Sequence, residues 1–274
     1  MNFLRLPLAA LLLATCLASL PADAAPRKPF PQAPFLEYTG SKPDHHSQPG
    51  LNAAVLKAYR LWKEHYLVES TLVPGDYKIA FNPEHWTVSE AMGYGMLITV
   101  QMAGADPEAR LIFDGLNRFR KRYPSSIDPA FMNWRIQDEG KAGKNDSATD
   151  GDMDMAMALL MAESQWGGGS YGKEAAVLIA ALGRTLVRPD DSLRLGDWDT
   201  SETGGKVGTR PSDFTTAHFR AFAKASGDPL WRRVEEKCYT ILEQLQNGST
   251  PATGLVPDFA VRQKDGSWKP APPG

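Results

Sequence analysis

Hydrophobic residues recur at helical spacing in seven segments of this 274-residue chain, and little between these segments resembles a strand. The predicted helices cover residues 51–66, 88–103, 107–122, 150–166, 171–187, 213–226 and 228–246. The linkers between them are long and carry glycine, proline, tryptophan and aspartate. The pattern therefore predicts an all-α fold in which long loops at one end hold the functional site.

Two of the predicted helices are apolar on every face. No residue between Ala91 and Ala103 is charged, and no residue from Met155 to Ala162 is polar. Such helices are buried, and these two are too short to cross a membrane. Residues 107–122 are instead amphipathic, with a face of Arg and Lys. Buried inner helices alternating with amphipathic outer ones predict a helical toroid, with an outer ring around an inner ring.

The first 25 residues have the three parts of a secretory signal peptide. Arg5 precedes an apolar stretch that ends near Leu20, and Ala22-Asp23-Ala24 is a small-x-small cleavage site. A membrane anchor is the alternative, but the stretch is short for a span and Pro7 interrupts it. We therefore expect a secreted or periplasmic protein that is free of the membrane once residues 1–25 are removed.

The composition is that of a soluble globular protein, with 42% hydrophobic and 23% charged residues. Lys and Arg number 30 against 32 Asp and Glu, so nothing in the charge suggests binding to nucleic acid or to an anionic membrane. Removal of the signal peptide leaves Cys238 as the single cysteine, which excludes an intrachain disulfide. We expect a monomer stabilised by packing alone.

Both ends of the mature chain lie outside the helical pattern. Residues 26–49 are rich in proline and predict an extended arm before a domain that covers residues 50–274. Seven helices do not close a double ring, and the final Pro272-Pro273-Gly274 is typical of a loop in mid-course. We therefore expect a barrel that is truncated at its C-terminus, with a frayed tail as the alternative.

Glu90 is the single charged residue at the start of the first apolar helix. We expect it to be buried there, and a buried carboxyl keeps its proton near neutral pH, as a general acid must. The spacing Thr87-x-x-Glu90 also fits a capping box, in which Glu90 would only satisfy a backbone N–H. Spacing alone leaves both interpretations open.

Three aspartates, Asp150, Asp152 and Asp154, alternate at the start of the second apolar helix. A calcium loop is excluded, because Met155 replaces the turn glycine and Met161 replaces the final glutamate. Helix capping needs only one acid. Three acids are costly to desolvate unless something polar occupies the space before them, and a polyhydroxylated ligand fits that requirement.

Further candidate residues lie in and beside the polar loops. Asp213 could cap a helix or pair with Arg210, and His218 has the spacing of a core histidine. Three tryptophans stand near charged residues in the linkers, at Trp86, Trp134 and Trp198. Tryptophans among acids suit a sugar-binding cleft, in which apolar sugar faces stack on rings. Acids with loop tryptophans, and without a metal, nucleotide or Ser/Cys nucleophile motif, favour glycoside hydrolysis.

Four motifs resemble those of glycoside hydrolase family 8, which includes the endoglucanases once called cellulase family D. Residues 148–166 resemble the family signature, and residues 89–96 are similar to its general-acid motif. Residues 210–220 and 254–258 are similar to two further motifs that follow in the same order. The resemblance extends from about residue 50 to residue 260.

This resemblance implies an (α/α)6 barrel and an inverting β-1,4-glycanase mechanism. It makes Glu90 the proton donor and Asp150, at a position once labelled nucleophile, a residue that holds the distorted sugar and organises water. The remaining expected substrate contacts are Trp134, Tyr94, Trp86, Trp198, Arg210 and Asp213. The family's base, an Asp in a later Tyr-Asp-Ala-x-Arg-like segment, does not occur before residue 274, which supports the expected truncation.

The leading hypothesis is a secreted inverting endo-β-1,4-glucanase, a cellulase, whose partner is a β-1,4-linked polysaccharide. A xylanase, a lichenase or a chitosanase of the same family is an alternative. A third hypothesis is a glycan-binding or cellulose-biosynthesis accessory protein without catalytic activity. The sequence implies no cofactor and no metal.

Overall fold

The computed structural model describes residues 25–32, 46–141, 145–202, 208–249 and 253–272. Seven α-helices occupy this part of the chain: α1 (Gln48–Tyr66), α2 (Ser89–Gln101), α3 (Ala109–Arg122), α4 (Thr149–Trp166), α5 (Ser170–Ala181), α6 (Thr216–Ser226) and α7 (Leu230–Ser249). All seven predicted helices are therefore confirmed. The helix predicted from residue 213 begins later, because Pro211–Asp213 form a separate 3-10 turn. The helix predicted to reach residue 187 continues beyond α5 as a π-helical turn over Leu182–Leu186.

Short antiparallel strands join the linkers to one another. They are β1 (Leu67–Glu69), β2 (Tyr77–Ile79), β3 (Thr87–Val88), β4 (Arg135–Ile136), β5 (Gly208–Thr209), β6 (Ala260–Arg262) and β7 (Trp268–Pro270). They pair as β1–β2, β3–β4 and β5–β6–β7. Two or three residues are too few to show an alternating pattern, so the sequence did not predict these strands.

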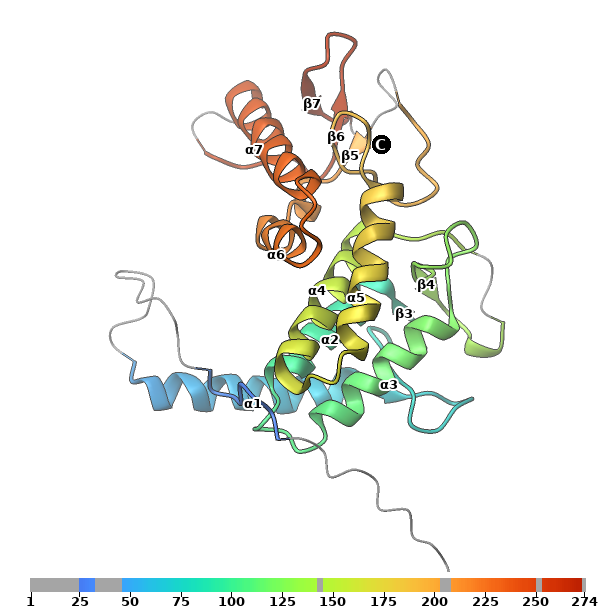
Figure 1. Cartoon of the computed structure of the whole chain (residues 1–274), viewed down its shortest axis with the longest axis vertical. Coiled ribbons are helices and arrows are strands. Elements are labelled where there is room, and N and C mark those ends of the chain that lie inside the picture. Colours follow the sequence, from blue (N-terminus) through green and yellow to red (C-terminus); the bar gives the residue numbers. More distant parts are fainter. Residues whose placement is uncertain (1–24, 33–45, 142–144, 203–207, 250–252, 273–274) are drawn as a thin grey trace, which may run out of the picture.

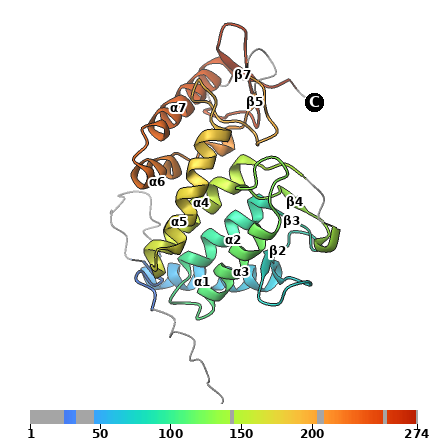
Figure 2. The same ribbon diagram turned by 45° about the vertical axis from the view of Figure 1, so that its right-hand side comes forward.

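The two all-apolar helices, α2 and α4, lie side by side at the centre of the structure (Figure 1). They run parallel, since Gly151 lies against Ser89 at one end and Gln165 Nε2 donates to the Val100 carbonyl at the other end. The amphipathic α3 packs on α2, and α5 packs on α4 (Figure 2). This arrangement confirms buried inner helices covered by outer ones.

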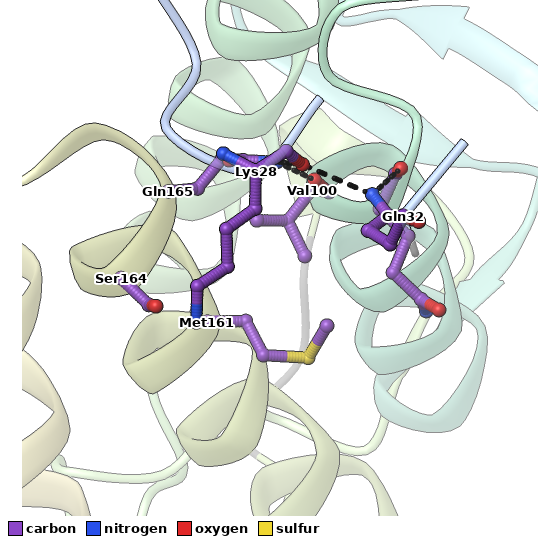
Figure 3. A pocket seen from close by; sticks show the side chains of 7 residues that line it. Lys28, Gln32, Val100, Met161, Ser164 and Gln165 are labelled. Atoms are coloured by element: carbon purple, nitrogen blue, oxygen red, sulfur yellow. Dashed lines mark hydrogen bonds between the residues drawn. The ribbon is translucent and has the colours of Figure 1, made fainter. Parts of the chain in front are cut away.

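Residues 25–32 lie against the C-terminal ends of α2 and α4 without forming a helix. Phe30 N donates to the Ala103 carbonyl at 2.7 Å, and the backbone of Lys28 exchanges two hydrogen bonds with the Gln165 amide. A pocket of about 270 Å³ borders this contact (Figure 3). The predicted signal peptide falls almost entirely on residues 1–24, outside the described residues, as does part of the predicted arm. Each helix of the described residues is too short or too polar to cross a membrane.

Candidate active site

The N-terminal turns of α2 and α4 pack closely on each other at two glycines, Gly93 and Gly151. A Cβ atom on Gly151 would lie 2.4 Å from the Ser89 carbonyl carbon, and one on Gly93 would lie 2.7 Å from Asp154 Cβ. Only glycine permits helices to approach this closely. The contact places Glu90 and Asp150 in the first turns of two adjacent helices. The close helix contact therefore holds the two candidate carboxyl groups at the same end of the inner helix pair.

Glu90 is half-buried, whereas the sequence had predicted a buried carboxyl. It shares a face of α2 with Tyr94, one turn later, and that ring is 50% exposed. The Tyr94 hydroxyl donates to Glu90 Oε1 at 3.0 Å. Burial, together with this hydrogen bond, raises the pKa of Tyr94 to about 12, so the phenol keeps its proton and remains a donor at neutral pH.

The capping-box interpretation of Thr87 and Glu90 is wrong. Thr87 is fully buried in β3, where it pairs with Ile136 of β4, and its Oγ1 has no hydrogen-bond partner within the described part of the chain. The residue before α2 is Val88, whose side chain makes no capping hydrogen bond. Ser89 N donates instead to the Trp134 carbonyl at 2.9 Å. This bond connects the candidate acid's helix to a predicted sugar-stacking residue.

The three alternating aspartates point to three different environments. Asp152 is fully buried, and its Oδ1 accepts a hydrogen bond from Met132 N at 2.9 Å. Asp154 Oδ1 lies 2.8 Å from His218 Nε2 and so connects α4 to α6. Asp150 alone lines the cleft described below. Burial raises the pKa of Asp150 and holds that of Asp152 well above its ordinary range.

A cleft of about 560 Å³ opens beside Asp150, within the usual size range of small-ligand sites. Its walls come from the α3–α4 linker, the α5–α6 linker, the segment after α7 and the start of α4. The lining residues are Trp134, Asp146, Ser147, Ala148, Asp150, Leu195, Trp198, Arg210, Asp213 and Phe259. Five residues predicted from the sequence therefore come together in one cleft, although they are spread over 80 positions from 134 to 213.

Aromatic rings form much of the wall. The Arg135 guanidinium lies over the Trp134 ring, with its central carbon 4.5 Å from the ring centroid. Trp198 is 47% exposed. Trp86 does not line the cleft: its backbone N donates to Asn82 Oδ1 in the turn before β3. Its predicted role in substrate binding therefore stays a prediction.

Asp213 lies at the bottom of the cleft with 3% of its surface exposed. Burial, followed by the negative charge of Asp150, raises the pKa of Asp213 to about 7. Arg210 opposes this rise, and it also reaches Asp258 Oδ1 at 3.1 Å. Asp213 is not a helix cap, because α6 begins three residues later at Thr216.

Asp197 holds two cleft-forming linkers together. Its carboxylate accepts hydrogen bonds from Ser125 Oγ at 2.5 Å, Asp128 N at 3.1 Å and Ser147 N at 2.8 Å. The residue is 6% exposed and flanks Trp198. Asp197, next to Trp198, thus fixes the linkers around the cleft through hydrogen bonds.

Sequence reasoning missed several lining residues, including Phe259, Asp146 and Leu195. These side chains carry no motif-level signal, and only the pairing of distant segments brings them to the cleft. The described residues contain no group of three or more His, Cys, Asp or Glu side chains placed to hold a metal ion.

Comparison with known proteins relates this chain to a family. The family model described as Glycosyl hydrolases family 8 matches residues 50–272. A Beta-glucanase of Niallia circulans is 42% identical over 266 residues, which cover 93% of this chain and 64% of that protein. An Endoglucanase of Bacillus sp. (strain KSM-330) is 41% identical over 265 residues, which cover 92% and 56%. The chain thus spans less than two thirds of either relative.

Solved structures share the fold. The apo structure of a beta-1,3-1,4-glucanase from Paenibacillus sp. X4 matches with a TM-score of 0.84 and 43% identity, covering 90% of this chain and 66% of that one. The endo-beta-1,4-glucanase CMCax from Acetobacter xylinum matches with a TM-score of 0.66 and 20% identity, covering 81% of this chain and 67% of that one. The predicted all-α fold of the (α/α)6 class is therefore confirmed.

Proposed function

This chain belongs to family 8 of the glycosyl hydrolases, and we propose that it acts as a secreted, inverting endo-β-1,4-glucanase. One observation carries the proposal: Glu90 and Asp150 stand in the first turns of two glycine-packed neighbouring helices, and Asp150 lines a cleft that three aromatic side chains also line. The names of the relatives, Beta-glucanase and Endoglucanase, support a β-glucan as the substrate.

In the proposed reaction, Glu90 is the general acid. Its carboxyl proton passes to the glycosidic oxygen while the bond between that oxygen and C1 breaks. The hydrogen bond from Tyr94 to Oε1 orients the carboxyl group toward the leaving oxygen. Water attacks C1 from the opposite face, and this attack inverts the configuration at C1. The water loses a proton to a base. We assign the base to none of the described residues.

Asp150 acts on the sugar at the cleavage point in this proposal. A carboxylate that accepts hydrogen bonds from sugar hydroxyls holds the ring in a distorted form and helps to order the attacking water. Two observations suit Asp150 to this role. Its side chain is 21% exposed, and Arg210 Nη1 lies 3.9 Å from its Oδ2. Trp134 and Trp198 would supply stacking surfaces, and Asp213 would bind hydroxyls from the bottom of the cleft.

A β-1,3-1,4-glucan is the second candidate substrate. The observation that favours it is the name of the Paenibacillus sp. X4 enzyme, which shares 43% identity with this chain. Relative rates on carboxymethyl cellulose and on barley β-glucan separate the two candidates. Faster hydrolysis of barley β-glucan by at least an order of magnitude would favour the mixed-linkage substrate.

The test is Glu90→Gln, which keeps the shape of the side chain and removes the transferable proton. We expect release of reducing sugar to fall about a thousandfold while glucan binding is retained. Glu64→Gln, on the exposed side of α1, is the matched control and should leave the rate unchanged. An active Glu90→Gln variant would refute the assignment of the acid. Glucan binding by the wild-type chain without any release of sugar would instead support the accessory-protein hypothesis.

We also propose that the protein is exported from the cell's cytoplasm and that it is a monomer. The signal-peptide pattern of residues 1–25 supports removal of that segment during secretion. N-terminal sequencing of the exported protein should find a first residue close to Ala25 or Pro26. Light scattering should give the mass of a single chain.

A further inference from the structure

Phe259 and Arg210 lie opposite each other at the ends of two neighbouring strands, β6 and β5, at the edge of the cleft. Strand β5 pairs with β6 in an antiparallel register that joins Thr209 to Ala260. The next position in this register sets Arg210 opposite Phe259. The side chains meet as this register requires, since the Arg210 guanidinium carbon lies 5.3 Å from the Phe259 ring centroid.

The position of Phe259 is held by the backbone on its other side as well. Ala271 N, just beyond β7, donates to the Phe259 carbonyl at 2.9 Å. The backbone of Phe259 is thus fixed at the margin of a three-stranded sheet, and the Arg210 guanidinium lies against its ring. A ring that is already ordered loses little conformational entropy when a ligand stacks on it.

The Phe259 ring is partly open to solvent. Phe259 is 42% exposed, and it lines the same cleft as Trp134 and Asp150. An apolar ring open to a cleft with acidic groups matches a sugar, whose ring faces are apolar and whose rim carries hydroxyls. Trp134 shows the same arrangement on a different linker, since the Arg135 guanidinium lies 4.5 Å from its ring centroid.

We propose that Phe259, backed by Arg210, is a stacking platform that binds one glucosyl ring of the substrate. This inference rests on the proposed function of the cleft as a glucan site. With Trp134, whose ring contacts the Arg135 guanidinium, the cleft would then contain two aromatic stacking surfaces that each contact an arginine. The bound ring would lie with an apolar face on Phe259, and its hydroxyls could reach the carboxylate of Asp258, which accepts from Arg210 Nε at 3.1 Å.

The test measures binding of cellohexaose and of a mixed-linkage hexasaccharide by calorimetry, with Glu90→Gln present in every variant to prevent turnover. Phe259→Leu keeps an apolar side chain beside the sheet and removes the aromatic face. We expect it to weaken binding about tenfold. Phe259→Trp should bind within about twofold of the parent, because an aromatic face remains.

Val256→Ala is the matched control, since Val256 has a similar exposure of 40% in the same segment and does not line the cleft. It should leave binding unchanged. Thermal unfolding of each variant verifies that the fold is intact. Equal affinity of Phe259→Leu and its parent would overturn the platform while leaving the proposed function standing. Absence of glucan binding by the parent itself would overturn both.

Discussion

Gly151 of α4 packs directly on the backbone of Ser89 in α2, and a Cβ atom at this glycine would lie 2.4 Å from the Ser89 carbonyl carbon. Backbone atoms inside a helix have little freedom to move aside. The contact therefore sets the separation between the first turns of the two inner helices. Glu90 follows Ser89 and Asp150 precedes Gly151, so the same contact sets the geometry of both candidate acidic residues.

Gly151→Ala should force α2 and α4 apart. We expect the free energy of unfolding to fall by about 1–3 kcal/mol, as is usual for overpacking, and glucan hydrolysis to fall as well. Gly248→Ala in α7 is the control, because a Cβ atom there meets nothing within 4 Å. Urea unfolding of both variants tests this expectation. Equal stability of Gly151→Ala and the wild type would show that the helix contact has room to relax.

Asp197→Asn should loosen two linkers at once. An amide has one acceptor oxygen, whereas the two carboxylate oxygens of Asp197 accept from Ser125 Oγ, Asp128 N and Ser147 N. We expect a loss of about 1–3 kcal/mol in stability, with KM for glucan raised more than kcat is lowered. Asp265→Asn, in an exposed turn, is the control. An unchanged KM would mean that the loops hold their positions without the carboxylate.

Asp213 should make the stability of the protein depend on pH. Its pKa rises from 3.8 to about 7 on folding, so the folded state keeps a proton that the unfolded state has lost. The free energy of unfolding should therefore fall as pH rises through this interval and level off above it. A rise of roughly three pKa units corresponds to about 4 kcal/mol at most.

Asp213→Asn removes this titration and should flatten the dependence between pH 5 and pH 8, relative to the wild type. Chemical unfolding at four or five pH values in that range makes the comparison. Parallel curves for the two proteins would show that Asp213 ionises alike in the folded and unfolded states.

Lys78 and Glu139 form a buried ion pair between β2 and the 3-10 turn Glu139–Lys141, with 2.7 Å between Nζ and Oε1. Their side chains are 7% and 3% exposed. Lys78→Met leaves the Glu139 charge buried without its partner, so we expect a loss of about 3–5 kcal/mol. The double variant Lys78→Met/Glu139→Met should recover most of that loss. Thermal unfolding distinguishes the outcomes, and a double variant as unstable as the single one would contradict this explanation.

Helical periodicity was sufficient to locate every α-helix of the described residues, because a helix buries one face through neighbours close in sequence. The same reasoning identified α2 and α4 as the inner pair, from the stretches 91–103 and 155–162, which carry no charged residue. The types of residue that suit a sugar cleft were also visible in the sequence, as loop tryptophans and acids. These are local properties, which each segment carries by itself.

Tertiary structure decided which way the individual acids point. Asp150, Asp152 and Asp154 have nearly identical sequence surroundings, yet they reach the cleft, the core and His218 respectively. The hundred-degree turn between successive helical residues separates them, and the position of each neighbouring helix then fixes the environment. Thr87 looked like a helix cap until its pairing with β4 placed it in an extended strand.

Phe259 shows the remaining limit of sequence reasoning. It reaches the cleft because β6 pairs with β5, whose residues lie about fifty positions earlier in the chain. Strand pairing over such a distance depends on how the helices between the strands are packed, and strands of two or three residues carry no periodic signal of their own. The sequence by itself thus determined the helices and the chemistry available, whereas the packing of distant segments determined which side chains meet in the cleft.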